Sequence, residues 1–247
     1  FSYYGDDCIK RFVYNPLMDM IREDVRYYRT IGLAGNFVLL TNPESWWSNA
    51  PHLYAYTRFA WDPDTPLATI EADYYDSLYG SASPAMKAHA EASRALFDMQ
   101  TAQGNRGEDI VWGQSYPLID AQADTQTRAQ GAAAVDKLHE CLRQAEATQP
   151  DPYVAERVRK LHADADYLGW LFEFISQARR TEQENTPEAK QRLLSLAEKG
   201  LELEVVAEDD RKGYRSARNV LLSTTRRLTG TEPEGTHGSP ASRAQYK

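Results

Sequence analysis

The sequence predicts an α/β segment followed by a mostly helical chain, and three observations carry this prediction. Residues 15–64 have the pattern of a helix, a strand, a loop and a second helix. Within them, the run from Phe37 to Leu40 is continuously apolar, which is typical of a strand buried on both faces. From about residue 127 to 228, apolar residues recur every three or four positions, as they do on amphipathic helices.

The N-terminal part is predicted to contain a strand end, a helix and the apolar strand. Residues 2–4 alternate small and aromatic side chains, as the end of a strand does. Asn15 followed by Pro16 predicts a helix start, because Asn caps backbone N–H groups and Pro fits the first turn. Gly32 marks the expected end of this helix, and a strand is expected over 33–40. The helix is expected to carry one apolar stripe: Met18, Ile21, Val25 and Tyr28. One such repeat cannot close a sheet, so we expect the beginning of this α/β domain to lie before residue 1.

Further helices are predicted after a polar loop. The loop TNPESWWSNAPH follows the apolar run, and the next helix is expected to end at Asp62 and Pro63. Helices are then expected over 67–79 and 83–103, before an irregular segment over 104–124 that contains several glycines.

The C-terminal half is predicted to be a helical bundle, in which Thr186 and Pro187 start one of the helices. The clearest apolar stripe has alternating spacings of four and three residues and indicates a packing face: Val154, Val158, Leu161, Ala165, Leu168, Phe172 and Ile175. The predicted division of the chain is an α/β segment, a connecting helix with an irregular linker, a bundle, and a polar tail that we expect to be disordered: 1–80, 81–126, 127–228 and 229–247.

Composition and charge exclude several classes of function. The net charge of −8 argues against a nucleic-acid partner, which needs basic patches to displace counterions. No apolar run approaches the length that spans a bilayer, and no signal peptide is visible in the opening FSYYGDD. No pair of histidines has metal-ligand spacing with acids or cysteines, so we expect no metal and no cofactor. Cys8 and Cys141 allow at most one disulfide, and two unrelated thiols are the simpler interpretation.

Four motifs in the first 100 residues resemble a known protein family. They are SYY at a strand end, IREDVRYYRTIGLAGNFV, HLYAYTRFAWDPD and YYDSLYGSASPAMKAH. In this order and spacing they resemble the C-terminal part of a bacterial domain of unknown function that is linked to glycoside hydrolases. That domain is similar to the α-glucuronidase and β-hexosaminidase type barrels, and some of its members are endo-β-N-acetylglucosaminidases. The helical stretch to about residue 180 resembles the family loosely.

The resemblance implies a fold and an activity. It implies that the chain holds the last β/α units of a truncated (β/α)₈ barrel, with the first six or so units absent. The catalytic acids of such barrels lie mainly at the ends of earlier strands, so the resemblance implies that they lie upstream of residue 1 and that this chain alone is inactive. The implied partner is a glycan or oligosaccharide that contains N-acetylglucosamine or uronic acid, and the implied location is secreted or periplasmic.

The resemblance also implies candidate site residues, because the site of a barrel lies at the C-terminal ends of its strands. The implied substrate-binding residues follow the two predicted strands: Tyr4, Asp6, Asn42, Glu44, Trp46 and Trp47. Asp6 is the candidate catalytic acid, since glycoside hydrolysis needs carboxyl groups beside the bond. Solvated loop acids are the alternative interpretation, which we prefer for Glu44. The two tryptophans suit either a sugar-stacking surface or a hydrophobic lid.

Residues 61–64, with the sequence WDPD, match the family most closely, and we expect a structural role for them. Trp61 is expected to pack against the fold, while the acids and Pro63 end one helix and cap the next.

Two classes of function remain open. The first is a glycoside hydrolase-like protein, and the second is a non-catalytic carbohydrate-binding or helical interaction module. The four motifs and the aromatic loop favour the first class, which is the leading hypothesis, while the long helices and the scarcity of candidate acids motivate the second.

Overall fold

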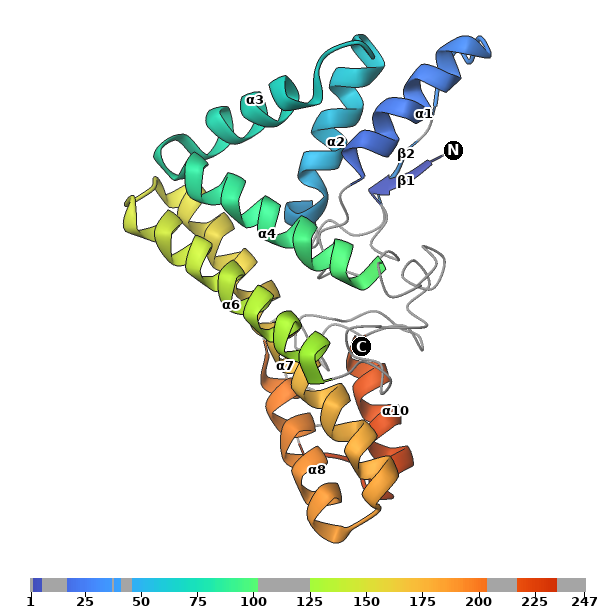
Figure 1. The fold of residues 1–247 in the computed structure, drawn as a ribbon, viewed down its shortest axis with the longest axis vertical. Helices are drawn as coiled ribbons and strands as arrows, with labels where there is room; N and C mark the ends of the chain where they lie inside the picture. Colours follow the sequence, from blue (N-terminus) through green and yellow to red (C-terminus); the bar gives the residue numbers. More distant parts are fainter. Residues whose placement is uncertain are drawn as a thin grey trace, which may run out of the picture. The chain divides into compact units, whose positions relative to one another are not determined.

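The computed structural model describes residues 2–5, 17–36, 38–40, 46–101, 125–203 and 217–234, and these are mostly helical (Figure 1). Two short strands, β1 (Ser2–Gly5) and β2 (Val38–Leu40), pair in parallel, with Ser2 opposite Val38 and Gly5 opposite Leu40. The helices are α1 (Met18–Thr30), α2 (Trp46–Trp61), α3 (Leu67–Tyr79), the 3₁₀ turn η2 (Gly80–Ala82), α4 (Ser83–Thr101), α6 (Thr125–Ala147), α7 (Pro152–Glu184), α8 (Pro187–Glu202) and α10 (Ala217–Thr229).

The prediction of an α/β fold made of the last units of a (β/α)₈ barrel is wrong. In the described ranges the chain is helical, and its strands are segments of four and three residues in a single ladder. Barrel units need a strand before each helix, whereas α2, α3 and α4 follow one another with no strand between them. The apolar run that predicted a long buried strand forms a strand over only Val38–Leu40.

The chain forms two compact units. The first consists of Phe1–Pro117 and Gln130–Ala165, and the second of Leu118–Ala129 and Asp166–Lys247. The predicted boundaries after residues 80, 126 and 228 stay a prediction, because these units group segments by packing and do not test which segments fold alone. No helix in the described part of the chain is both long and apolar enough to cross a membrane.

The core of the first unit lies where α1, α2 and α3 meet. On α1 and α2 the buried side chains are three or four positions apart, and α3 adds one more: Met18, Ile21, Val25, Ala55, Phe59 and Ile70. The predicted apolar stripe of the first helix is therefore confirmed for its first three members. Gly32 has a φ of 68°, a left-handed conformation that glycine adopts at low cost, and it follows the end of α1 as predicted.

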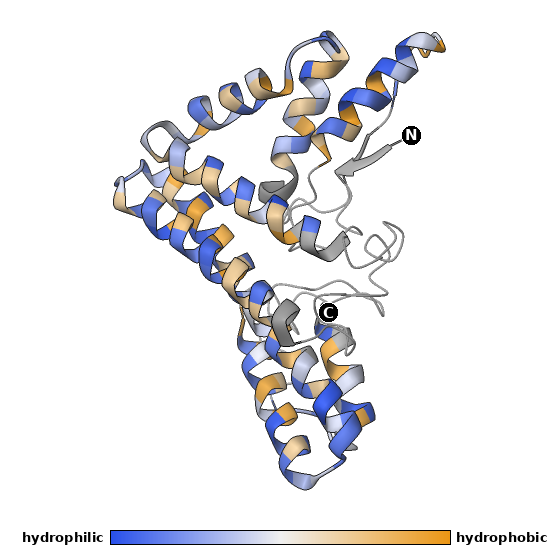
Figure 2. Cartoon of the chain, in the orientation of Figure 1, coloured by the Kyte–Doolittle hydropathy of each residue, from blue (hydrophilic) through white to orange (hydrophobic). Residues whose placement is uncertain are grey.

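The second unit packs α8 and α10 together with the C-terminal part of α7. Trp170 is buried, its ring stacks on Phe174 with centroids 5.0 Å apart, and its indole N–H donates to the Leu196 carbonyl at 2.8 Å. Thr186 caps α8 by accepting a hydrogen bond from the Ala189 N–H at 3.2 Å, which confirms the predicted helix start. Hydrophilic and hydrophobic residues alternate around the helices, as expected for amphipathic elements (Figure 2).

The predicted stripe on the long helix α7 is confirmed over most of its length. Its first five members are buried: Val154, Val158, Leu161, Ala165 and Leu168. Phe172 is half-buried, and the side chain of Ile175 lies outside the described part of the chain. The residues of this helix up to Ala165 belong to the first unit, and those from Asp166 belong to the second.

Candidate functional site

The described structure places the backbone of only three of the predicted site residues. Tyr4 lies in β1, while Trp46 and Trp47 form the start of α2, and none of their side chains is described. The prediction that the two tryptophans lie in a loop is wrong, because α2 already begins at Trp46. The helix continues through Pro51, which lies in its interior. Asp6, Asn42 and Glu44 lie outside the described residues, as does Cys8, so their predicted roles stay predictions.

The WDPD segment forms the turn between α2 and α3. One carboxylate oxygen of Asp62 accepts the backbone N–H of Asp64 at 3.1 Å, and the other accepts the Thr65 hydroxyl at 3.0 Å. A side chain that bonds the backbone two residues ahead stabilises a tight turn. Pro63 is buried in this turn. The expectation that Asp62 and Pro63 end α2 in a turn is therefore confirmed, whereas the expectation that they cap the next helix is wrong, because α3 starts after Pro66 with no side-chain cap.

Trp61 behaves differently from the expectation, because its side chain is 92% exposed. The buried face of α2 carries Ala55 and Phe59, which are four residues apart and point the same way. Trp61 lies two residues beyond Phe59, about 200° around the helix, and therefore faces away from that core. The prediction that this indole packs against the fold is wrong.

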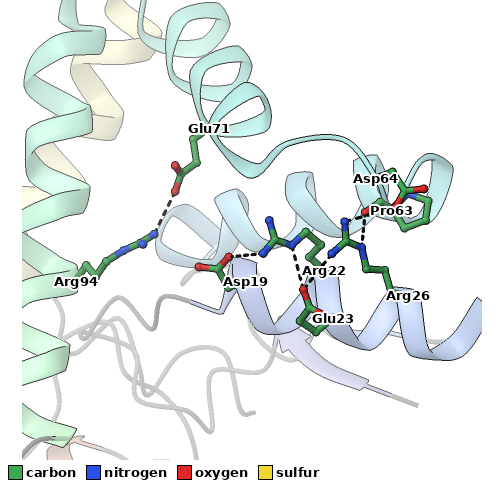
Figure 3. A network of polar contacts seen from close by, with 8 residues as sticks. All are labelled: Asp19, Arg22, Glu23, Arg26, Pro63, Asp64, Glu71 and Arg94. Atoms are coloured by element: carbon green, nitrogen blue, oxygen red, sulfur yellow. Dashed lines mark hydrogen bonds and ion pairs between the residues drawn. The ribbon is translucent and has the colours of Figure 1, made fainter.

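Arg26 joins α1 to the WDPD turn (Figure 3). Its Nε donates to the Pro63 carbonyl at 3.1 Å, its Nη2 lies 3.4 Å from Asp64 Oδ1, and its Nη1 lies 3.3 Å from Glu23 Oε1. Arg22 continues this chain of charges between Glu23 and Asp19. The planar guanidinium suits such a junction, since it donates in several directions at once.

Replacing Arg26 by Ala is expected to lower the free energy of unfolding of the first unit by about 1 kcal/mol, because the Pro63 carbonyl loses its donor. Urea denaturation followed by circular dichroism measures this change. Arg29→Ala is the matched control, since Arg29 is an exposed arginine on the same helix. Equal losses in both variants would contradict the assigned role of Arg26.

A second polar group lies between α2 and α3. Asp73 accepts hydrogen bonds from the Tyr54 hydroxyl and from Arg58 Nη1, the latter at 2.7 Å. The hydrogen bond from Tyr54 and the charge of Arg58 lower the pKa of Asp73, and the same hydrogen bond raises the pKa of Tyr54. A carboxylate held ionised cannot donate a proton, so this group suits the binding of hydroxyl groups or a structural role rather than acid catalysis.

Glu71 of α3 is the carboxyl group for which the described structure resolves a raised pKa. Burial is the main cause, and the charges of Asp19 and Glu91 add to it, while Arg94 opposes it. Arg94 Nη2 lies 3.1 Å from Glu71 Oε1 (Figure 3). A raised pKa is typical of general acids in glycoside hydrolases, but the ion pair with Arg94 favours the charged form of Glu71. This arrangement therefore indicates a half-buried ion pair that joins α3 to α4.

Sequence reasoning missed all these polar contacts except the turn at Asp62. Tyr54 and Asp73 are 19 residues apart, and Glu71 and Arg94 are 23 apart. Neither pair lies within one helix, so no helical spacing points to it. Arg58 and Trp61 lie in the motif HLYAYTRFAWDPD. That motif was the only feature of the sequence that drew attention to these two residues.

No family model, no curated protein and no solved structure matches this chain. The family resemblance therefore rests on the four motifs in the first 100 residues alone.

Proposed function

We propose that this chain is a glycan-binding part of a glycoside hydrolase-like protein and that Trp61 is its sugar-stacking residue. The observation that carries the proposal is the 92% exposure of this indole in the segment that most resembles the family. Aromatic rings gain free energy when an apolar face covers them, and the C–H-rich face of a pyranose is such a surface. The hydrogen-bonded turn that follows Trp61 fixes its backbone and lowers the entropy lost on binding.

The charges beside Trp61 favour a neutral sugar over a uronic acid. Asp62 and Asp64 follow Trp61 closely in the chain, and both would repel the carboxylate of a uronic acid. The Arg26 guanidinium, which offsets part of this charge, is already bound to Pro63 and Asp64. N-acetylglucosamine carries no charge and presents an acetamido group that can bond to the carboxylates. Of the two sugar classes that the resemblance implies, N-acetylglucosamine is therefore the proposed ligand.

The described acids support binding rather than hydrolysis. Asp73 has a lowered pKa, and Glu71 is paired with Arg94, so neither is suited to protonate a leaving group. The proposal assigns no catalytic role to any described residue. Hydrolysis by this protein would need acids that lie outside the described ranges.

Trp61→Ala is expected to weaken the binding of N-acetylchitotriose at least about tenfold, which corresponds to about 1.4 kcal/mol. Isothermal titration calorimetry of the full chain measures the dissociation constant. Tyr153→Ala is the matched control, since Tyr153 is also an exposed aromatic residue but lies on α7. Binding of equal strength in wild type and Trp61→Ala would contradict the role of Trp61, and no measurable heat with wild type would contradict the proposed function.

A second candidate function is a helical interaction module, which one further observation favours. The outer side of α1 exposes Met20 and Tyr27, and Ile31 follows directly after the helix. Tyr27 follows Met20 by seven residues and Ile31 follows Tyr27 by four, so the three residues lie along one face. An exposed apolar row on a helix is typical of protein–protein contacts. This function needs no affinity for sugars, so the calorimetric titration separates the two candidates.

A further inference from the structure

Three histidines from three helices lie together in the first unit. His89 is on α4, His139 on α6 and His162 on α7. The Nδ1 atoms of His139 and His162 are 3.3 Å apart, and their rings are nearly parallel, at 22°, with centroids separated by 5.5 Å. His89 is close enough to both rings for their charges to act on it. We call these residues the histidine cluster.

The arrangement does not suit a metal ion. In the described ranges, no group of three or more His, Cys, Asp and Glu side chains is placed to hold one. The two ring nitrogens of His162 also face different neighbours, since Nδ1 faces His139 and Nε2 lies 3.4 Å from Glu146 Oε1. A single ion cannot use both nitrogens of one imidazole. The chemistry left for the histidine cluster is proton uptake.

The contact between His139 and His162 tolerates one added proton but not two. Two facing Nδ1 atoms attract each other only when one of them carries hydrogen. A second proton would place N–H groups on both Nδ1 atoms and like charges on both rings. Full protonation therefore opposes the packing of α6 on α7.

We propose that the histidine cluster is an acid-sensitive contact that holds α4, α6 and α7 of the first unit together at neutral pH and loosens them in mildly acidic solution. Histidine is suited to this role, because its ordinary pKa lies just below neutral pH. Each of the three helices contributes one imidazole, so the repulsion between charged rings acts between helices rather than within one. The second unit contains none of the three histidines and is expected to keep its stability.

The environment of His89 gives the sign of the pH dependence. Burial and the charges of His162 and His139 lower the pKa of His89 from 6.5 to about 4. The folded unit therefore binds fewer protons than the unfolded chain between these values, so its stability is complete above pH 6.5 and declines as the pH falls toward 4. For a shift of this size the unfolding equilibrium constant rises by about tenfold between pH 7.4 and 5.5. Part of the His89 side chain still reaches solvent, so this figure is an upper value for His89 alone.

Charged neighbours of the histidine cluster do not reverse this sign. The charged residues within two positions of each histidine, together with Glu146 beside His162, come from all three helices: Lys87 and Glu91 on α4; Lys137, Glu140 and Glu146 on α6; and Lys160 and Asp164 on α7. Carboxylates ordinarily titrate near pH 4 and lysines above pH 10. A comparison of pH 7.4 with pH 5.5 therefore spans the ordinary pKa of histidine in the unfolded chain while leaving the charges of these neighbours mostly unchanged.

Hydrogen exchange of the full chain, read by mass spectrometry at pH 7.4 and 5.5 and corrected for intrinsic rates, tests the proposal. Peptides of α4, α6 and the first half of α7 are expected to open about tenfold more at pH 5.5, while α8 and α10 change less than twofold. In His89→Gln the increase is expected to shrink to a few-fold. An unchanged opening in wild type, an equal rise in α8, or a full response in His89→Gln would overturn the proposal.

If His89→Gln does not fold, a titration of the wild-type histidine ring protons by nuclear magnetic resonance replaces it. One histidine signal is expected to titrate far below 6.5, near pH 4. Histidine signals that all titrate at ordinary values would overturn the proposal.

Discussion

Gly200→Ala is expected to lower the free energy of unfolding of the second unit by about 3 kcal/mol. In most helices the same change stabilises, by about 1 kcal/mol, because Ala has a higher helix propensity than Gly. The sign reverses here because a Cβ atom on Gly200 would lie 2.1 Å from Trp170 Cζ2 and 2.9 Å from Leu221 Cδ1. The indole cannot easily retreat, since its N–H is bonded to the Leu196 carbonyl and its ring is stacked on Phe174.

Urea denaturation followed by circular dichroism measures this change, and two variants control it. Gly35→Ala adds a Cβ that meets nothing within 4 Å, so it is expected to change stability by no more than about 0.5 kcal/mol. Trp170→Phe makes room for the new methyl group, so the double variant is expected to lose less than the sum of the two single losses. Strict additivity, or a stabilising Gly200→Ala, would contradict the packing described here.

Phe59→Ala is expected to cost the first unit about 4 kcal/mol. Phe59 is fully buried and lies among the apolar side chains that α1 and α3 present to α2. Removing its ring loses the transfer free energy of the ring and leaves a cavity that rigid helices fill only in part. This loss exceeds the expected cost of any surface change on the same helix.

Circular dichroism during thermal and urea unfolding measures the loss in Phe59→Ala. Trp61→Ala is the internal control, because it removes a larger ring from the same helix at an exposed position and is expected to change stability by less than about 0.5 kcal/mol. The pair separates stability from binding, since Trp61→Ala is expected to lose glycan affinity while remaining folded. Similar destabilisation by both variants would contradict the assignment of the two faces of α2.

Local features of this fold follow from sequence, whereas contacts between distant residues do not. The stripe of Met18, Ile21 and Val25 and the cap at Thr186 depend only on neighbouring residues, and both occur as predicted. The polar pairs between α2, α3 and α4 join residues 19 and 23 apart, so no periodicity indicates them. The histidine cluster draws on three helices and is likewise invisible to sequence spacing.

The largest error of the sequence interpretation concerns the barrel. A four-residue apolar run and a strand end are compatible with a barrel unit, but they are equally compatible with one short ladder beside helices. The resemblance favoured the barrel, whereas the described chain pairs only two short strands and is otherwise made of successive helices. Trp61 was misplaced for a related reason, since a role was carried over from a barrel wall that the described chain does not contain.

The most direct test of the proposed function is a titration of the ¹⁵N-labelled chain with N-acetylchitotriose, read at the tryptophan indole N–H signals. The signal assigned to Trp61, by its absence in Trp61→Phe, is expected to shift most and to saturate. The signal of the buried Trp170 is expected to stay in place, because its N–H is bonded inside the second unit. A Trp61 signal that does not move at saturating sugar would contradict the assignment of Trp61 as the sugar-stacking residue.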